Sequence, residues 1–252
     1  MTGPSITDME RVASTFGVGM EQVRRDHLIS HVLAAIATDI STYDVVFFGG
    51  TALSRTHLAE ARLSEDIDLI ARIHRGEIAK QIERAVRRGL ARSHGRPTWR
   101  PPLTTTTGSQ PTVLSVPDGT SVQVQLLGGK GYTWPTEVVQ VEQRYSDAPT
   151  ARLRVLTAAA FAAAKLGAWL DRGTPRDLYD LWAMNERNLI GPSALRVFTS
   201  NGRFGKPPPA WVFNRKLDEG EWIRALGHQT RLRVSAREAI AAVRQAWSDA
   251  AK

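Results

Sequence analysis

The sequence has 252 residues and contains no cysteine. Disulfides, cysteine-ligated zinc, iron–sulfur clusters and thiol nucleophiles are therefore excluded. The chain also lacks a long apolar run, because Lys165 interrupts the most apolar stretch, residues 158–170, which is too short to span a bilayer. The N-terminal residues lack the basic and apolar segments of a secretory signal. We therefore expect a cytoplasmic protein without a membrane partner.

Positive charge is distributed unevenly along the chain. Residues 1–149 contain 16 Lys and Arg against 16 Asp and Glu, whereas residues 150–252 contain 17 against 9, which gives net charges of 0 and +8. A basic half suggests an acidic partner, and a nucleic-acid backbone is the commonest one. The alternative is a basic solvated surface, and charge alone favours neither.

Hydrophobic periodicity changes at about the same place as the charge. Up to about residue 147 it predicts an α/β fold, a mixed sheet with flanking helices, and beyond residue 149 it predicts helices. We therefore expect a core domain over residues 1–149 and a basic helical subdomain over residues 150–252. The expected elements are helices at 21–40 and 76–91, strands at 43–48, 66–70, 113–116 and 121–127, a loop at 97–110, and further helices at 157–170, 177–186 and 235–250.

Two aspartates, Asp66 and Asp68, lie in the apolar run at 66–70. Alternation along a strand places both carboxylates on one face, with Ile67 and Leu69 on the other. Because neighbouring carboxylates repel each other, we expect a cation between them, most simply Mg²⁺ with its preference for oxygen ligands. The alternative is an edge strand on which both aspartates face water or pair with arginines.

A glycine pair ends the preceding strand. Gly49 and Gly50 allow close approach of the backbone, and Thr51 can cap the following helix, so this turn can hold an anion at its N–H groups. A plain strand-to-helix turn uses the same residue types. Together with Asp66 and Asp68, however, the turn predicts a phosphate site and a metal site at one edge of the sheet, as phosphoryl or nucleotidyl transfer requires.

Two motifs together resemble those of the AbiEii nucleotidyltransferase toxins, the group that includes the MenT toxins of toxin–antitoxin systems. The first is GGT at 49–51 followed by SEDID at 64–68, and the second is Lys165 followed by RGTPRDLYDL at 172–181. The resemblance implies a nucleotidyltransferase fold with a helical C-terminal part, Mg²⁺, a nucleoside triphosphate donor and a cognate antitoxin protein. For MenT-like members it further implies transfer of nucleotides, often pyrimidines, to the 3′ end of tRNA, which blocks translation.

The resemblance also implies a role for each motif residue. Asp66, Asp68, Lys165 and Asp177 would be catalytic, Asp66 and Asp68 would hold the metal, and Gly49, Gly50, Thr51, Ser64 and Arg176 would bind the nucleotide, with Asp180 in support. Alternatives exist for the second motif. Lys165 could lie at the rim of the core with its amine in water, and Asp177 and Asp180 could cap a helix and pair with Arg176 or Arg172.

One departure from this pattern concerns the strand at 121–127. Many enzymes of the fold have a third carboxylate on a later strand, whereas this strand has Gln123 and Gln125 on one face. Glutamine can ligate a metal but cannot take a proton. Asp177 could then serve as the base, activation could rest on the metal alone, or the protein could be a slow or inactive member.

Two other functions remain open. The protein could transfer nucleotides to a protein hydroxyl or a small molecule, or it could be an inactive homologue that binds nucleic acid.

Two further signals have simple explanations. His27 and His31 lie one helical turn apart, but the sequence offers no third ligand, so packing is preferred to metal binding. The tryptophans of the second half are expected to pack between helices, although one could stack on an unpaired base.

Overall fold

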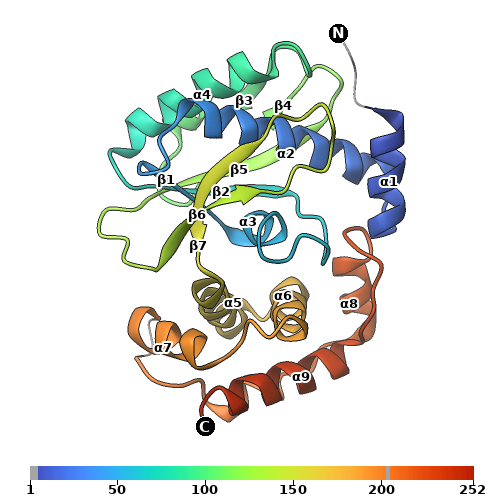
Figure 1. Cartoon of the computed structure of the whole chain (residues 1–252), viewed down its shortest axis with the longest axis vertical. Coiled ribbons are helices and arrows are strands. Elements are labelled where there is room, and N and C mark those ends of the chain that lie inside the picture. Colours follow the sequence, from blue (N-terminus) through green and yellow to red (C-terminus); the bar gives the residue numbers. More distant parts are fainter. Residues whose placement is uncertain (1–4, 203–204) are drawn as a thin grey trace. The chain divides into compact units, whose positions relative to one another are not determined.

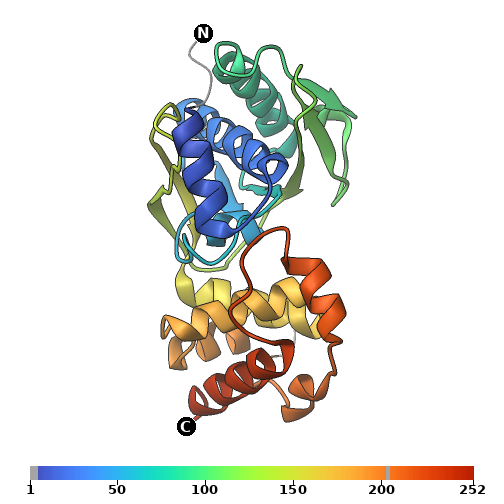
Figure 2. The same cartoon turned by 90° about the vertical axis from the view of Figure 1, so that its right-hand side faces the viewer.

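The computed structural model describes residues 5–202 and 205–252 and divides into two compact units (Figures 1 and 2). Unit 1 comprises the chain up to Tyr132 together with Glu137–Val155, and unit 2 comprises Thr133–Thr136 and Leu156–Lys252. Unit 1 contains nearly all of a mixed sheet, and unit 2 is mainly helical. The expected α/β fold with a helical C-terminal part is therefore confirmed.

Unit 1 is built around a seven-stranded mixed sheet. Its elements are α1 (Ile6–Phe16), α2 (Met20–Asp39), β1 (Val45–Phe48), α3 (Gly49–Ser54), β2 (Asp66–Ala71), α4 (Arg75–Leu90), β3 (Thr98–Arg100), the 3-10 helix η1 (Leu103–Thr105), β4 (Thr112–Ser115), β5 (Ser121–Gly128), β6 (Thr136–Val141) and β7 (Ala151–Leu156). The strand order is β3-β4-β5-β2-β1-β7-β6. Strand β2 is antiparallel to β1 and parallel to β5, and β1 is parallel to β7. The strand with the aspartate pair therefore lies in the middle of the sheet.

The periodic elements of unit 1 are confirmed to within about two residues, but two expectations are wrong. The loop predicted at 97–110 contains strand β3, which pairs with β4 through Trp99 and Leu114. The prediction that only helices follow residue 149 fails at β7, where Leu153 and Val155 are buried between more exposed arginines. The basic outward face of this strand obscured its two-residue alternation.

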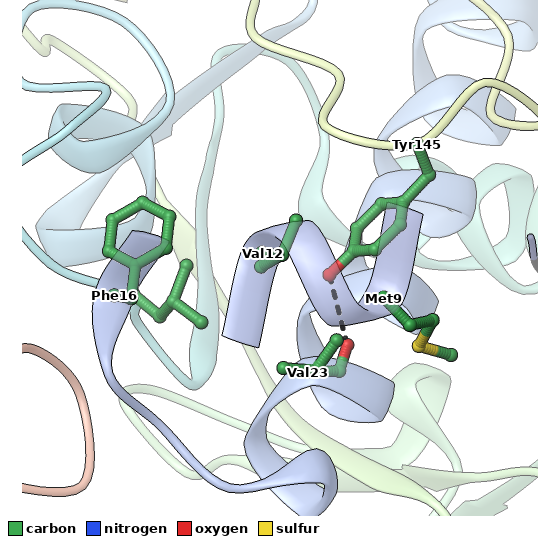
Figure 3. Packing of buried hydrophobic residues seen from close by; sticks show 6 residues of the cluster. Met9, Val12, Phe16, Val23 and Tyr145 are labelled. Atoms are coloured by element: carbon green, nitrogen blue, oxygen red, sulfur yellow. Dashed lines mark hydrogen bonds between the residues drawn. The ribbon is translucent and has the colours of Figure 1, made fainter. Parts of the chain in front are cut away.

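Helix α1, which periodicity did not predict, covers the N-terminal end of α2 (Figure 3). It begins at the cap residue Ser5 and ends at Gly17, whose φ of 68° is readily adopted by glycine. Its apolar face packs into a small cluster of buried residues, and the Tyr145 hydroxyl donates to the carbonyl oxygen of Val23 at 3.1 Å. The cluster consists of Met9, Val12, Phe16, Val23, Leu63 and Tyr145.

Unit 2 is a set of helices joined by short segments. Its helices are α5 (Ala158–Arg172), α6 (Pro175–Glu186), α7 (Pro192–Asn201), the 3-10 helix η2 (Ala210–Asn214), α8 (Glu219–Leu226) and α9 (Ala236–Asp249). The three predicted helices are confirmed, and α7 and α8 are additional. Trp169, Trp222 and Trp247 are buried as expected, whereas the side chain of Trp211 is 65% exposed. Within the described part of the chain, none of the helices has the length and apolarity needed to traverse a bilayer.

Candidate active site

The turn between β1 and α3 brings the backbone against the second aspartate. Gly49 has a φ of +78°, and a Cβ atom at this position would collide with the Oδ2 atom of Asp68. Glycine is the residue that meets both the conformational and the steric requirement. The close approach at Gly49 is therefore to the carboxylate of Asp68, whereas the phosphate site expected at the glycine pair stays a prediction.

The second glycine of the turn lies beside a buried cation. A Cβ atom at Gly50 would lie 2.9 Å from Nη2 of Arg62 and 3.1 Å from Oγ of Ser64. Both of these side chains are buried. Ser64 was predicted as a site residue, whereas Arg62 was not, because no spacing distinguishes it from the other arginines. The turn thus has a hydroxyl and a guanidinium next to its backbone.

Thr51 does not cap the helix, and that expectation is wrong. The helix begins at Gly49 with Phe48 as its cap residue, so Thr51 lies inside the first turn. Its side chain is buried, and its hydroxyl donates to the backbone carbonyl of Asp66. Thr51 therefore ties α3 to the strand that carries the aspartate pair.

Asp66 and Asp68 lie on the same face of β2, as the alternation predicts. Both are partly exposed, whereas Ile67 and Leu69 are buried on the opposite face. Because β2 pairs with both β1 and β5, the alternative of an edge strand is excluded. Two carboxylates are thus held side by side at a partly solvated position in the interior of the sheet.

The neighbouring strand places amides beside both carboxylates. Residues in register on parallel strands point to the same face, and Gln123 pairs with Asp66 while Gln125 pairs with Asp68. The amide nitrogen of Gln125 donates to the carbonyl of Ser109, which fixes the orientation of that amide. The strand therefore lacks the third carboxylate that many enzymes of this fold have, and the side chain beside Asp68 is an amide that cannot accept a proton.

Lys165 of the second motif is buried between two carboxylates in unit 2. Its Nζ lies 3.3 Å from Oδ1 of Asp177 and 2.6 Å from Oδ2 of Asp180. The side chain is only 9% exposed, so the alternative of an amine in water at the rim of the core is wrong. The apolar sequence around Lys165 could not show this arrangement, because both partners come from the next helix.

Asp177 is fully buried and accepts hydrogen bonds from several partners. Arg172 binds it in bidentate fashion, with Nε–Oδ2 and Nη2–Oδ1 distances of 2.7 and 2.8 Å, and the Thr174 hydroxyl donates to Oδ2 at 2.6 Å. Burial raises the pKa of Asp177, but the hydrogen bond from Arg172, the charge of Lys165 and the Thr174 hydroxyl outweigh it and lower the pKa to about 2. The predicted pair with Arg172 is therefore present, and the carboxylate is ionised at neutral pH.

The predicted site residues thus form two groups, one in each unit. In unit 1 the turn at 49–51 lies against the side chains of residues 62, 64 and 68. In unit 2 Lys165, Asp177 and Asp180 form one ion-paired cluster, and Arg176 is exposed on the first turn of α6.

The sequence of this chain matches a known family over most of its length. The model of the nucleotidyl transferase AbiEii toxin family, from type IV toxin–antitoxin systems, matches residues 31–252. The chain belongs to the AbiEii family. Members of this family are nucleotidyltransferases, so the suspected resemblance is confirmed and the chain is assigned as a nucleotidyltransferase toxin. Membership implies a nucleoside triphosphate substrate and an antitoxin.

Solved structures support the fold of this AbiEii protein. MenT4, a nucleotidyltransferase toxin from Mycobacterium tuberculosis, is similar over 97% of this chain and 89% of its own, with a TM-score of 0.73 and 20% identity. At that identity the similarity shows the fold. A nucleotidyltransferase-like antigenic protein from Paracoccidioides brasiliensis covers 75% of this chain and 98% of its own, but its TM-score of 0.37 and 13% identity carry no argument. No curated protein sequence matches the chain.

Proposed function

We propose that this AbiEii protein is a Mg²⁺-dependent toxin of the cytoplasm that transfers a pyrimidine nucleotide to the 3′ end of tRNA and thereby blocks translation. The observation that carries the proposal is the pair of carboxylates on β2, placed next to a turn that only glycine can form. Paired carboxylates beside a close-approach backbone are the elements that nucleotidyl transfer requires.

The residues around the pair fit a hard divalent cation. Asp66 and Asp68 supply carboxylate oxygens on one face of β2, and the amides of Gln123 and Gln125 adjoin them. Such oxygen donors suit Mg²⁺, which retains positions for water and substrate phosphates. When bound, the ion supplies charge neutralisation for the triphosphate and lowers the pKa of the attacking hydroxyl. We propose that Asp66 and Asp68 hold it.

The nucleotide phosphates would bind at the turn between β1 and α3. Gly49 and Gly50 supply backbone without side chains, and Ser64 supplies a hydroxyl beside Gly50. The hydroxyl of Thr51 already donates to the backbone carbonyl of Asp66, so Thr51 would contribute to phosphate binding through its backbone N–H. We add Arg62 to this set, because a guanidinium next to the turn can neutralise phosphate charge.

The second motif completes the proposed set of functional residues. We propose that Lys165 and Arg176 act in nucleotide binding, and that Asp177 acts by positioning Lys165 and Arg172. With a pKa of about 2, Asp177 is a poor proton acceptor at neutral pH, which argues against its use as the general base.

The acceptor would bind to the basic second half of the chain. Its net charge of +8 favours a polyanion, and Trp211 offers an exposed ring on which a base can stack. Arg231 and Arg233 are exposed arginines of this half. A tRNA acceptor end, with unpaired bases and a phosphate backbone, combines both features.

The direct test uses the purified full chain, MgCl₂, total tRNA and each of the four labelled nucleoside triphosphates in turn. We expect label on the 3′ end of tRNA from a pyrimidine triphosphate, and loss of that label with chelator or with Asp66→Asn or Asp68→Asn. Glu10→Gln, which removes an exposed carboxylate of α1, is the matched control and should transfer as the unaltered chain does.

The acceptor is tested separately by charge reversal. Arg231→Glu together with Arg233→Glu should reduce transfer to tRNA, whereas Arg84→Glu together with Arg87→Glu, at exposed arginines of α4 outside the basic half, should not. Label on a protein or small molecule, unaffected by the first change, would replace tRNA as the acceptor. If no acceptor is labelled while tRNA still binds in the presence of chelator, the protein is a nucleic-acid-binding homologue without transferase activity.

A further inference from the structure

Three histidines from two separate parts of unit 1 meet in one cluster. His27 and His31 come from α2, and His94 lies just beyond the end of α4. Each offers a ring nitrogen, and these three nitrogens all lie within 4.8 Å of one another. The ring centroids are 4.7 to 4.9 Å apart. The third ligand that the sequence did not reveal is therefore supplied by His94.

A carboxylate holds one side of the cluster. The Nε2 atom of His27 lies 3.1 Å from both carboxylate oxygens of Asp147, and its Nδ1 atom lies 3.1 Å from Nε2 of His94. A carboxylate that accepts from one ring nitrogen leaves the other as a lone-pair donor and orients the ring, as in many zinc sites. The side of His27 that faces His94 is thus prepared to bind a cation.

One nitrogen of the cluster is buried with a single long contact. His31 is 7% exposed, and its Nε2 lies 3.4 Å from Oδ2 of Asp147, too poorly aligned for a good hydrogen bond. Buried polar atoms are almost always well satisfied, so this nitrogen has capacity for a further partner. A bound cation would satisfy it.

An entry path exists beside the cluster. A surface hollow of about 410 Å³ between α2 and α4 is lined in part by His31. The hollow therefore brings solvent next to one member of the cluster, and a functional metal site requires such a path of entry.

We propose that His27, His31 and His94 bind one divalent transition-metal ion of the zinc class, with Asp147 as the carboxylate that orients His27. Ligand atoms in a tetrahedral zinc site lie about 3.3 Å apart, given bonds of about 2.0 Å. The distance of 3.1 Å between His27 and His94 meets this requirement, whereas the full spread of 4.8 Å among the three nitrogens would have to shorten on binding. Imidazole ligands select zinc, cobalt, nickel or copper over Mg²⁺.

The charge state of the cluster suits a cation. Asp147 and Asp118 supply the nearby negative charge. A bound ion would join α2, the segment after α4 and the segment after β6, so we assign it a structural role that is independent of nucleotide transfer.

The test uses the full chain without an affinity tag, freed of metal by chelator and titrated with CoCl₂, ZnCl₂ or MgCl₂. We expect one equivalent of Co²⁺ with the intense visible absorption of a four- or five-coordinate site, displacement of Co²⁺ by Zn²⁺, and no effect of Mg²⁺. Absence of stoichiometric binding, or only the weak bands of six-coordinate Co²⁺, would overturn the proposal. This measurement needs no variant, so it does not depend on any variant folding.

Variants locate the ion. His31→Ala and His94→Ala should each weaken Co²⁺ binding by about 100-fold or more, and Asp147→Asn by about 10- to 100-fold. His74→Ala removes an exposed histidine of the same unit and should bind as the unaltered chain does. Asp66→Asn combined with Asp68→Asn should also leave Co²⁺ binding intact, which separates this site from the proposed Mg²⁺ site. Equal binding by His31→Ala, His94→Ala and the unaltered chain would refute the assignment.

Discussion

Replacement of Asp26 by asparagine should destabilise unit 1 more than any surface change. Asp26 is 1% exposed, and its Oδ1 accepts from Arg55 at 2.8 Å and from Arg144 at 3.1 Å. The single proton of the Tyr145 hydroxyl is shared between Oδ2 of Asp26 at 3.0 Å and the Val23 carbonyl at 3.1 Å. Two buried guanidinium groups therefore share a single buried carboxylate as their counter-ion. Asp26→Asn keeps the shape of the side chain and removes this charge.

The expected cost follows from the charges left behind. Removing one partner of a buried ion pair costs about 3–5 kcal/mol, because the remaining charge stays desolvated. Burial already lowers the pKa of Arg144 to about 10 even with Asp26 opposing it, so loss of Asp26 leaves that desolvation uncompensated. At about 2–4 °C per kcal/mol for a unit of this size, Tm should fall by about 6–20 °C.

The assay is urea and thermal unfolding followed by far-UV circular dichroism. Asp249→Asn, which removes an exposed ion pair with Lys252 at the C-terminal end of the chain, is the control and should leave the midpoint unchanged. Replacing all three charges together, as Asp26→Leu, Arg55→Met and Arg144→Met, should recover much of the loss. A loss below about 1 kcal/mol for Asp26→Asn would refute the reasoning, since it would mean that water reaches these charges.

Three further predictions concern the candidate site and unit 2. The pKa of Asp177 is lowered from 3.8 to about 2 by folding, which contributes about 2 kcal/mol to the free energy of unfolding. This contribution is present above about pH 4 and is lost as the pH falls through 2. Asp177→Asn should remove this part of the acid dependence of unfolding. Gly49→Ala should abolish nucleotide transfer, whereas Gly119→Ala, with φ of +87° but open space around it, should cost stability only. Trp211→Ala should weaken tRNA binding in a filter-binding assay and leave Tm unchanged, whereas the buried Trp222→Ala should lower Tm.

The parts of the fold that could be predicted from the sequence are those with local signals. The alternation around Asp66 and Asp68 placed both carboxylates on one face, and the structure agrees because β2 has a buried face and a partly exposed one. The glycine pair correctly marked a close approach of the backbone. The side chain that this backbone approaches is that of Asp68 on the adjoining strand, and this contact could be known only from the pairing of β1 with β2.

The parts that could not be predicted depend on contacts between distant segments. His94 joins the two histidines of α2 only because α4 lies beside that helix, and Arg62 reaches Gly50 only through the path of the loop after α3. The start of α3 is a further case, because a helix was expected only after Thr51 and the structure begins it at Gly49. Isolated helices of this length are unstable in water, so the residues of α3 carry little helical signal of their own.

The position of α3 must therefore come from its surroundings. Its first turn is tied to β2 by the hydroxyl of Thr51, and its C-terminal cap residue, Arg55, is bound to Asp26 of α2. Tyr145 joins the same network, and its ring packs edge-on against that of His27 at 4.8 Å. Contacts therefore run without a break from the histidine cluster through the buried charges to the helix that holds the glycine turn. Rigidity at this turn therefore comes from the hydroxyl of Thr51 and from the buried ionic contacts of Arg55, because Gly49 and Gly50 have no side chains to provide it.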